Sequence, residues 1–256
     1  MSRHRFFLSG PLTAPHVGAV VVAPLTAEDT RHAIKALRLR VAEEIDLVEP
    51  EGAVWRTSVS GVGGDSLTVE VLERLAVPQE PDVTLIFGVL KGSKNDDVVE
   101  GAVEVGVTAM QPVQFERSIV RLDAAKSAER GDRWRRVALA AAKQSKRARV
   151  PAVADPVDVV DLVELLSAYD AALVAWEDAD GAGIATRLTH LALSADARVA
   201  VVVGPEGGLS ADEVSTLQAA GALTCTLGPT ILRAETAGVV ATALVVHELG
   251  GLGRAL

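Results

Sequence analysis

The sequence has a single cysteine, Cys225, and few aromatic residues, which make up 3% of its 256 positions. One cysteine cannot form an internal disulfide framework, so we expect a protein of a reducing compartment. Because aromatic rings are scarce, the core must be aliphatic, and the 49% of hydrophobic residues supplies it. The sequence lacks both a signal-peptide pattern and an apolar run of about 18 residues, the length that spans a membrane. We therefore expect a soluble, cytoplasmic protein with no membrane partner.

Two common nucleotide-binding motifs are also missing. No glycine-rich loop ends in Gly-Lys-Ser or Gly-Lys-Thr, which excludes a phosphate-loop hydrolase. No Gly-x-Gly-x-x-Gly follows a strand candidate, which argues against an ordinary dinucleotide-binding domain.

Acidic residues outnumber basic ones by 34 to 25, and the formal net charge of −9 by itself argues against a nucleic-acid partner. The distribution of charge argues for one. Residues 126–149 hold nine basic and two acidic side chains, a local net charge of +7. So few compensating carboxylates favour contact with RNA phosphates over an ordinary solvated helix.

The proline-rich segment 77–81 predicts a boundary between two domains, residues 1–76 and residues 77–256. The first domain has short strand candidates separated by glycine-rich turns, at 5–8, 19–22, 44–48, 54–59 and 66–72. One helix interrupts them and begins at Thr26, a suitable N-cap residue. Five strands around one helix predict a compact barrel.

In the second domain strands alternate with helices, which is typical of an α/β fold with a parallel sheet. The strand candidates are residues 83–90, 108–115, 171–175, 199–203 and 223–227, and the helix candidates are residues 96–105, 132–147 and 236–249. The last helix is apolar almost all round, so it should be buried or packed on a partner.

Two loops in this domain have the composition of a binding site. Gly204-Pro-Glu-Gly-Gly-Leu-Ser210 follows one strand, and the sequence Ser210-Ala-Asp-Glu213 predicts a capping box that starts a helix. Gly228-Pro-Thr-Ile-Leu-Arg-Ala-Glu-Thr236 follows the next strand. In open α/β sheets ligands bind beyond the carboxyl ends of the strands, so we expect the two loops to form one site.

Basic residues outside residues 126–149 form two smaller groups. His32 lies close in sequence to Lys35, Arg38 and Arg40, which suggests contact with phosphates. Lys91-Gly-Ser-Lys94 follows the first strand of the second domain and is either a solvated loop or a further RNA contact.

The two paired loops resemble the signature of the RsmE family, methyltransferases of the SPOUT class. The resemblance extends to His32 with Leu37-Arg38, to Lys91-Gly-Ser-Lys94 and to Ala140-Ala-Ala-Lys-Gln-Ser-Lys-Arg147. It implies S-adenosylmethionine-dependent methylation of N3 of a uridine in 16S ribosomal RNA of the small ribosomal subunit. It also implies a PUA-like N-terminal β-barrel, a C-terminal α/β domain with a trefoil knot, a homodimer, and no metal.

The resemblance also implies roles for individual residues. As a hypothesis, Glu235 accepts the N3 proton or orients the acceptor, and Arg233 stabilises the developing negative charge or grips a phosphate. The cofactor-binding candidates are Val203, Gly204, Pro205, Glu206, Gly207, Gly208, Leu227, Gly228, Ile231, Leu232 and Thr236. The RNA-binding candidates are His32, Arg38, Lys91, Lys94, Arg133, Arg136, Lys143, Lys146 and Arg147.

Two alternatives stay open. One is a SPOUT methyltransferase that acts on another base, or on a ribose hydroxyl, of ribosomal or transfer RNA. The other is a non-catalytic RNA-binding assembly factor, against which the intact glycines of both loops count.

Overall fold

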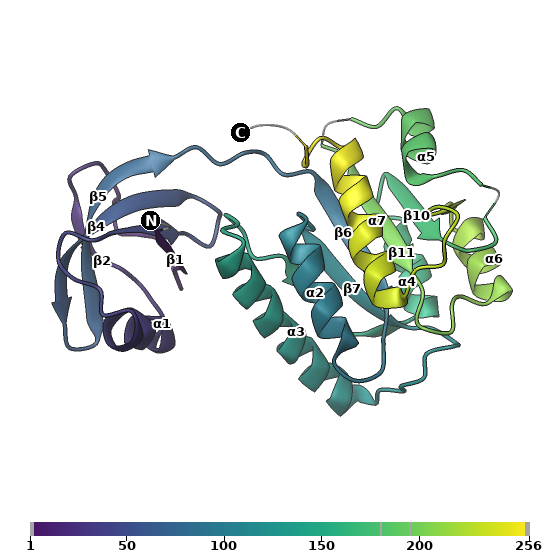
Figure 1. Cartoon of the computed structure of the whole chain (residues 1–256), viewed down its shortest axis with the longest axis horizontal. Coiled ribbons are helices and arrows are strands. Elements are labelled where there is room, and N and C mark those ends of the chain that lie inside the picture. The colour runs from purple at the N-terminus through teal and green to yellow at the C-terminus, as the bar shows by residue number, and fades with distance from the viewer. Residues whose placement is uncertain (1–2, 180, 195, 254–256) are drawn as a thin grey trace. The chain divides into compact units, whose positions relative to one another are not determined.

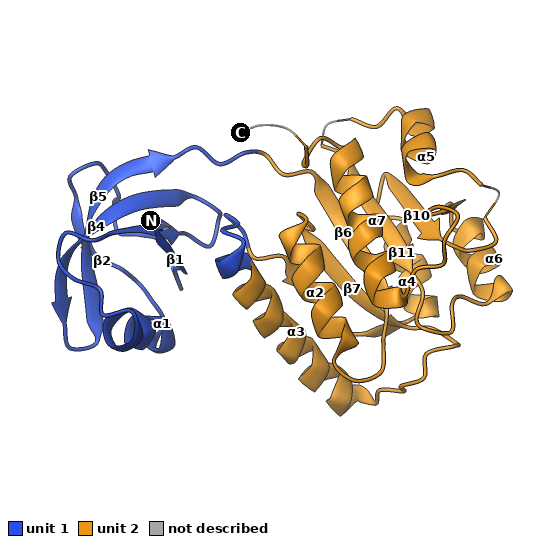
Figure 2. Cartoon of the chain, in the orientation of Figure 1, with its two compact units in different colours: residues 1–78, 142–149 blue, residues 79–141, 150–256 orange. Residues whose placement is uncertain are grey.

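The structure is a computed structural model that describes residues 3–179, 181–194 and 196–253. The chain forms two compact units (Figure 2). The first unit comprises residues 1–78 together with 142–149, and the second comprises residues 79–141 and 150–256. The expected α/β class is confirmed. The inclusion of residues 142–149 in the first unit was not expected, because local sequence patterns do not show which core a helix end joins.

The first unit contains one five-stranded sheet with the order β1-β3-β4-β5-β2. Its strands are β1 (His4–Phe7), β2 (Val20–Val22), β3 (Glu44–Val48), β4 (Val54–Gly63) and β5 (Ser66–Leu75). Just beyond the two edge strands, the Ser9 amide donates to the Pro24 carbonyl at 2.8 Å, which brings the edges of the sheet together. The five predicted strands are confirmed. In β5 the alternate residues Leu67, Val69 and Val71 are buried, as the period-2 pattern indicated.

The predicted helix of this unit starts as expected and then departs from α geometry. Thr26 caps α1 (Ala27–Arg31) by accepting a hydrogen bond from the Asp29 amide at 3.1 Å. The next turn, η1 (His32–Ala36), is π-helical, and the Leu37 amide donates to the His32 carbonyl at 2.9 Å. Such wider turns often occur at functional sites.

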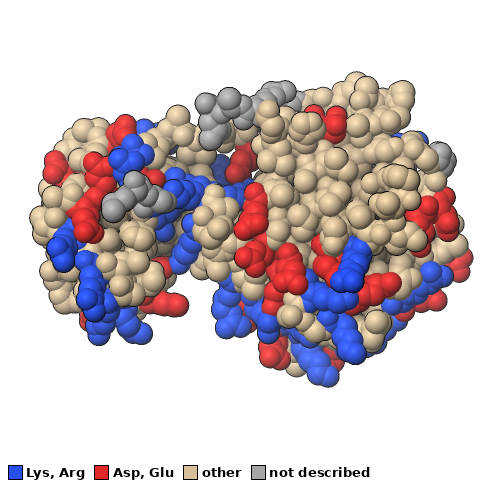
Figure 3. Space-filling model, viewed as in Figure 1, with Lys and Arg blue, Asp and Glu red and all other residues tan. Residues whose placement is uncertain are grey.

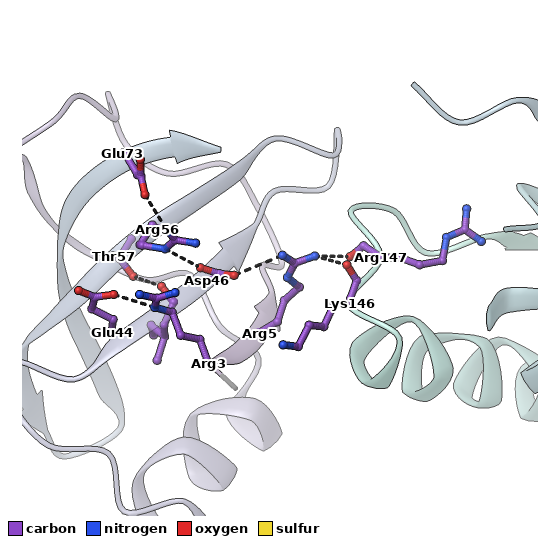
Figure 4. A network of polar contacts seen from close by, with 10 residues as sticks. Arg3, Arg5, Glu44, Asp46, Arg56, Thr57, Glu73, Lys146 and Arg147 are labelled. Atoms are coloured by element: carbon purple, nitrogen blue, oxygen red, sulfur yellow. Dashed lines mark hydrogen bonds and ion pairs between the residues drawn. The ribbon is translucent and has the colours of Figure 1, made fainter. Parts of the chain in front are cut away.

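Residues 142–149 are held in the first unit by Arg5 of β1 (Figure 4). The Arg5 guanidinium donates to the carbonyls of Lys146 and Arg147, which follow the end of helix α3. Its other nitrogen lies 3.2 Å from Asp46, which also pairs with Arg56 at 3.5 Å. A cation at the unsatisfied carbonyls of a helix end is favourable, so this network fixes the end of α3 on the sheet of its unit.

The described part of the second unit contains a seven-stranded parallel sheet with the order β12-β10-β11-β6-β7-β8, and β9 also pairs with β7. Its strands are β6 (Asp82–Gly88), β7 (Ala109–Gln114), β8 (Ala152–Val153), β9 (Val157–Asp158), β10 (Ala171–Ala175), β11 (Arg198–Val203) and β12 (Leu223–Cys225). Its helices are α2 (Lys94–Glu104), most of α3 (Ala124–Gln144), α4 (Val159–Leu166), α5 (Ile184–Leu191), α6 (Ala211–Ala219) and α7 (Ala234–Glu248).

Helices cover both faces of this sheet. On one face, Leu162 of α4 and Leu217 of α6 pack against Ile86 and Val202 of the central strands. On the other face, α7 contacts β6, β11 and α2 (Figure 1). The core is mainly aliphatic, as expected, but it also contains buried aromatic side chains, among them Phe115 and Phe87, whose ring lies 5.8 Å from that of buried Trp134.

The parallel register places the strand ends that matter for function at one edge. Ala175, at the end of β10, is paired with Val203 of β11 and with Cys225 of β12. The loops that follow these three strands therefore begin next to one another.

Candidate functional site

A pocket of about 640 Å³ lies at this carboxyl edge of the second unit. Its wall is formed by the residues after β10, the segment after β11, the segment between β12 and α7, and Lys94 of α2. The two glycine-rich loops thus line one pocket, as expected, and its use as a binding site stays a prediction.

Most of the cofactor-binding candidates line this pocket. They are Val203, Gly204, Pro205, Glu206, Gly207, Gly208, Leu227, Gly228, Ile231 and Leu232, and the pocket also contains the catalytic candidates Arg233 and Glu235. Thr236 is exposed in the first turn of α7 and is not among the lining residues. Their roles toward a ligand stay predictions.

Sequence reasoning missed a third wall of the pocket, formed by Ala175, Trp176 and Glu177. The signal was present, because the strand at 171–175 was predicted and its carboxyl end belongs to the same edge of the sheet. The segment contains no glycine or proline to draw attention to it.

The loop after β11 is a tight turn that requires glycine. Gly208 has a φ of +70°, which L side chains rarely adopt, and its amide donates to the Pro205 carbonyl at 2.9 Å. Gly88, at the end of β6, lies so close to this loop that a Cβ atom on Gly88 would be 2.5 Å from the Pro205 nitrogen. The predicted capping box is present, since Ser210 and Glu213 each accept the other's backbone amide at the start of α6.

Three charged side chains meet on one side of the pocket. The ammonium of Lys94 lies 3.3 Å from Oε1 of Glu206 and 3.8 Å from Oε2 of Glu235. Oε1 of Glu206 also accepts the backbone amide of Lys91 at 3.1 Å. Oε2 of Glu206 and Oε2 of Glu235 are buried and have no hydrogen-bond partner within the described chain. Both oxygens can therefore accept a hydrogen bond from a ligand.

Arg233 is the N-cap residue of α7. Its backbone carbonyl accepts the Ala237 amide at 2.7 Å, whereas its side chain forms no capping hydrogen bond. The side chain is exposed at the pocket and forms no ion pair with a described residue. Among the described residues that line the pocket, Arg233 therefore has an unpaired guanidinium, while the carboxylates of Glu206 and Glu235 share Lys94.

Cys225 lies beside this site at the end of β12 but is fully buried. Burial raises the pKa of its thiol to about 12. The thiol therefore stays protonated and cannot serve as a nucleophile at neutral pH.

The RNA-binding candidates differ in their partners. Arg133 of α3 donates to the carboxylate of Asp96, a bond that raises the pKa of its guanidinium above the usual value. Lys143 lies 2.6 Å from Asp29, and Arg136 donates to the carbonyl of Asp132 at 3.3 Å. For Arg133 and Lys143 the fold thus supplies carboxylates from outside residues 126–149, which a count of charge within that segment could not include. Figure 3 shows acidic side chains lying among the basic ones on one face of the molecule.

Other candidates are open to solvent. His32, Arg38, Lys91 and Lys146 are exposed and form no ion pair with a described residue. Arg147 is buried, and Lys94 belongs to the pocket of the second unit. Arg38 and Lys146 have positive φ values of 54° and 57°, which marks sharp changes of chain direction at both positions.

His32 also lines a second pocket, of about 570 Å³, that lies within the first unit. Phe6 and Leu37 provide apolar surface, and the cations Arg31 and Lys35 lie around it. Sequence reasoning found His32 and Lys35 but not Arg31 or the pocket.

In the described residues, no group of three or more His, Cys, Asp or Glu side chains is arranged to hold a metal ion. None of the described helices has the length and apolar character needed to cross a membrane.

Comparison with known proteins identifies the family. Residues 78–246 match the model of an RNA methyltransferase domain, and residues 25–72 match that of an RNA methyltransferase PUA domain. Ribosomal RNA small subunit methyltransferase E of Mycobacterium bovis is 35% identical over 91% of this chain and 88% of its own length. The enzyme of that name from Bacillus subtilis is 29% identical over 95% of this chain and 96% of its own.

A solved structure agrees with these matches. Ribosomal RNA small subunit methyltransferase E from Neisseria gonorrhoeae, determined with bound S-adenosyl methionine, superimposes with a TM-score of 0.78 at 30% identity. The superposition covers 95% of this chain and 96% of the Neisseria chain. The chain therefore belongs to the ribosomal RNA small subunit methyltransferase E family, with a PUA-type domain before an RNA methyltransferase domain.

Proposed function

We propose that this chain transfers a methyl group from S-adenosylmethionine to N3 of one uridine in 16S ribosomal RNA of the small ribosomal subunit. The observation that carries the proposal is the pocket of the second unit. All of its loops fall within the RNA methyltransferase domain match, and the similar Neisseria enzyme was solved with S-adenosyl methionine.

The residues of the pocket fit this cofactor. A volume of about 640 Å³ suits a ligand of its size. The backbone of residues 203–208 and 227–232 can enclose the adenosine and methionine parts. The Oε2 atoms of Glu206 and Glu235, which have no hydrogen-bond partner in the described chain, can accept hydrogen bonds from the ligand. No metal is needed, since the bound cofactor supplies a methyl group that its sulfonium already activates.

Two side chains carry the chemistry on the RNA. Glu235 accepts the proton that uridine N3 loses, and Arg233 donates to O2 or O4, where negative charge develops. Both residues follow β12 within three positions of each other, so one loop places both next to the base. Alignment of N3 with the methyl group lowers the activation barrier further, by roughly several kcal/mol.

RNA is attracted by the exposed basic side chains that form no ion pair with a described residue. His32 and Arg38 belong to this set in the first unit, together with Arg31, Lys35 and Lys146. The pocket of the first unit combines the apolar side chains of Phe6 and Leu37 with basic ones, beside Glu28 and Asp29, and fits a single unstacked nucleotide whose phosphate meets the basic side chains. Lys91 provides a separate contact on the second unit, whereas Arg133, Arg136, Lys143 and Arg147 contribute less because each already has a partner.

The finer structural assignments belong to the same proposal. Residues 1–76 form a PUA-like RNA-binding barrel and residues 77–256 a SPOUT domain with a trefoil knot. The knot is supported by α7, which follows the edge strand β12 but packs on the central strands β6 and β11. A homodimer is supported by Ile231, which is 93% exposed at the pocket, and by Leu244 on α7, which is 37% exposed. A cytoplasmic location follows from a ribosomal substrate.

The proposal is tested by incubating the protein with labelled S-adenosylmethionine and either 16S ribosomal RNA or small subunits that lack the modification. Label in the RNA supports it. Absence of label in both substrates, with RNA binding intact, would favour the assembly-factor alternative.

A further inference from the structure

Lys94 connects three segments of the second unit that lie far apart in the sequence. It is the first residue of α2, while Glu206 follows β11 and Glu235 lies in the first turn of α7. Its ammonium is 3.3 Å from Glu206 and 3.8 Å from Glu235. We call these three residues the Lys94 bridge.

The burial of the bridge indicates what it does. The side chains of both glutamates are 18% exposed, whereas that of Lys94 is 43% exposed. Two carboxylates that both lie within reach of one ammonium repel each other if that cation is removed. Lys94 is the cation in contact with both, and Arg233 forms no ion pair with either. Without the ammonium, neither carboxylate would keep this cation as a partner.

We propose that Lys94 is a positioning residue of the methyl-transfer site and not an RNA contact. It holds the carboxylate of Glu235 at the pocket and fixes the loop after β12 against the loop after β11. This inference rests on the proposed function for its catalytic consequence, but the bridge itself belongs to the free protein.

Lys91 offers a matched control on the same loop. Its side chain is exposed, and its contact with Glu206 is made by the backbone amide, which a substitution retains. Loss of the Lys91 side chain therefore removes a cation from the surface but leaves the bridge in place.

The first experiment compares Lys94→Met, Lys94→Arg and Lys91→Met in methyl transfer. Lys94→Met should lower kcat about 100-fold, the scale of a small misplacement of a catalytic group. Its Kd for 16S ribosomal RNA and the salt dependence of that Kd should match those of the unaltered protein. Lys94→Arg should recover most of kcat. Lys91→Met should instead weaken RNA binding and reduce the slope of log K against log salt by about one.

The second experiment measures amide hydrogen exchange of the protein without cofactor or RNA. Lys94→Met should speed exchange in residues 226–236, and Lys91→Met should not. This measurement needs no catalysis, so it judges the bridge even if no methyl transfer is found and the proposed function fails. Should Lys94→Met lower Tm strongly, Glu206→Gln weakens the same bridge with less change of shape and should give the same local exchange.

The inference is overturned if Lys94→Met weakens RNA binding and reduces the salt slope by about one while kcat is retained. It is equally overturned if exchange in residues 226–236 is unchanged in both Lys94→Met and Glu206→Gln.

Discussion

Nε of Arg133 in α3 lies 3.0 Å from Oδ2 of Asp96 in α2, within the second unit. The carboxylate precedes the arginine by 37 residues, so no local count of charge could have assigned it to α3. This pair shows that a basic segment is not the same as a free basic surface.

The salt dependence of RNA binding should therefore separate paired from unpaired cations. Arg31→Gln and Lys35→Gln should each reduce the slope of log K against log salt by about one, because each removes a free charge that meets a phosphate. Arg133→Gln should change the slope by clearly less, since RNA must compete with Asp96 for its guanidinium. Equal slopes for all three variants would contradict the assignment of RNA to the first unit.

Arg233 should affect turnover and not cofactor affinity. Arg233→Ala removes the unpaired guanidinium from the pocket, and loss of a donor to developing negative charge lowers kcat by about 100- to 1000-fold. The Kd for S-adenosylmethionine, measured by calorimetry, should stay close to that of the unaltered protein. Unchanged turnover would remove Arg233 from the mechanism.

Gly88 should prove essential to the shape of the pocket although it does not line it. In Gly88→Ala the new Cβ would lie 2.5 Å from the Pro205 nitrogen, so the loop after β11 must move. We expect a loss of about 1–3 kcal/mol in stability, together with weaker binding of S-adenosylmethionine.

Gly183→Ala is the matched control for this substitution. Its Cβ would lie 3.9 Å from the Thr226 carbonyl, an ordinary contact. Cofactor affinity should be retained in this variant. If Gly88→Ala binds cofactor as well as the control does, close packing at Pro205 does not shape the site.

Cys225 predicts a specific loss of stability in alkali. Its thiol pKa is 9.0 in the reference state and about 12 in the folded protein. Because the unfolded thiol ionises first, the folded state loses stability as pH rises from 9 toward 12, by up to about 1.4 kcal/mol per pH unit. The free energy of unfolding should fall more steeply in this range for the unaltered protein than for Cys225→Ala. Rapid alkylation of the native thiol at pH 8 would contradict its burial.

Much of the architecture follows from local sequence patterns. Alternation in residues 66–72 predicts β5, and the Ser210 to Glu213 spacing predicts the start of α6 because both are properties of a few adjacent residues. Helix α4 (Val159–Leu166) was missed, since its β-branched valines resemble a strand. The expected helix at 132–147 spans residues 124–144, and sequence analysis missed its N-cap, Asp123, whose carboxylate accepts the Lys126 amide at 2.9 Å.

The candidate site, like the fold, could be predicted from the sequence only in part. The two glycine-rich loops are visible in the sequence because glycine and proline mark turns. The bridge of Lys94 to Glu206 and Glu235 is not visible, because it depends on where β6, β11 and β12 end in one sheet. Long-range ion pairs are determined by topology, and so the roles of individual cations could not be separated before the fold was known.

The most direct test of the central claim is identification of the methylated nucleoside. Small ribosomal subunits that lack the modification are incubated with the protein and S-adenosylmethionine, and the digested 16S ribosomal RNA is analysed by mass spectrometry. The account predicts N3-methyluridine at a single position. A 2′-O-methylated nucleoside or a methylated base other than uridine would contradict it, because neither reaction needs removal of the N3 proton by Glu235.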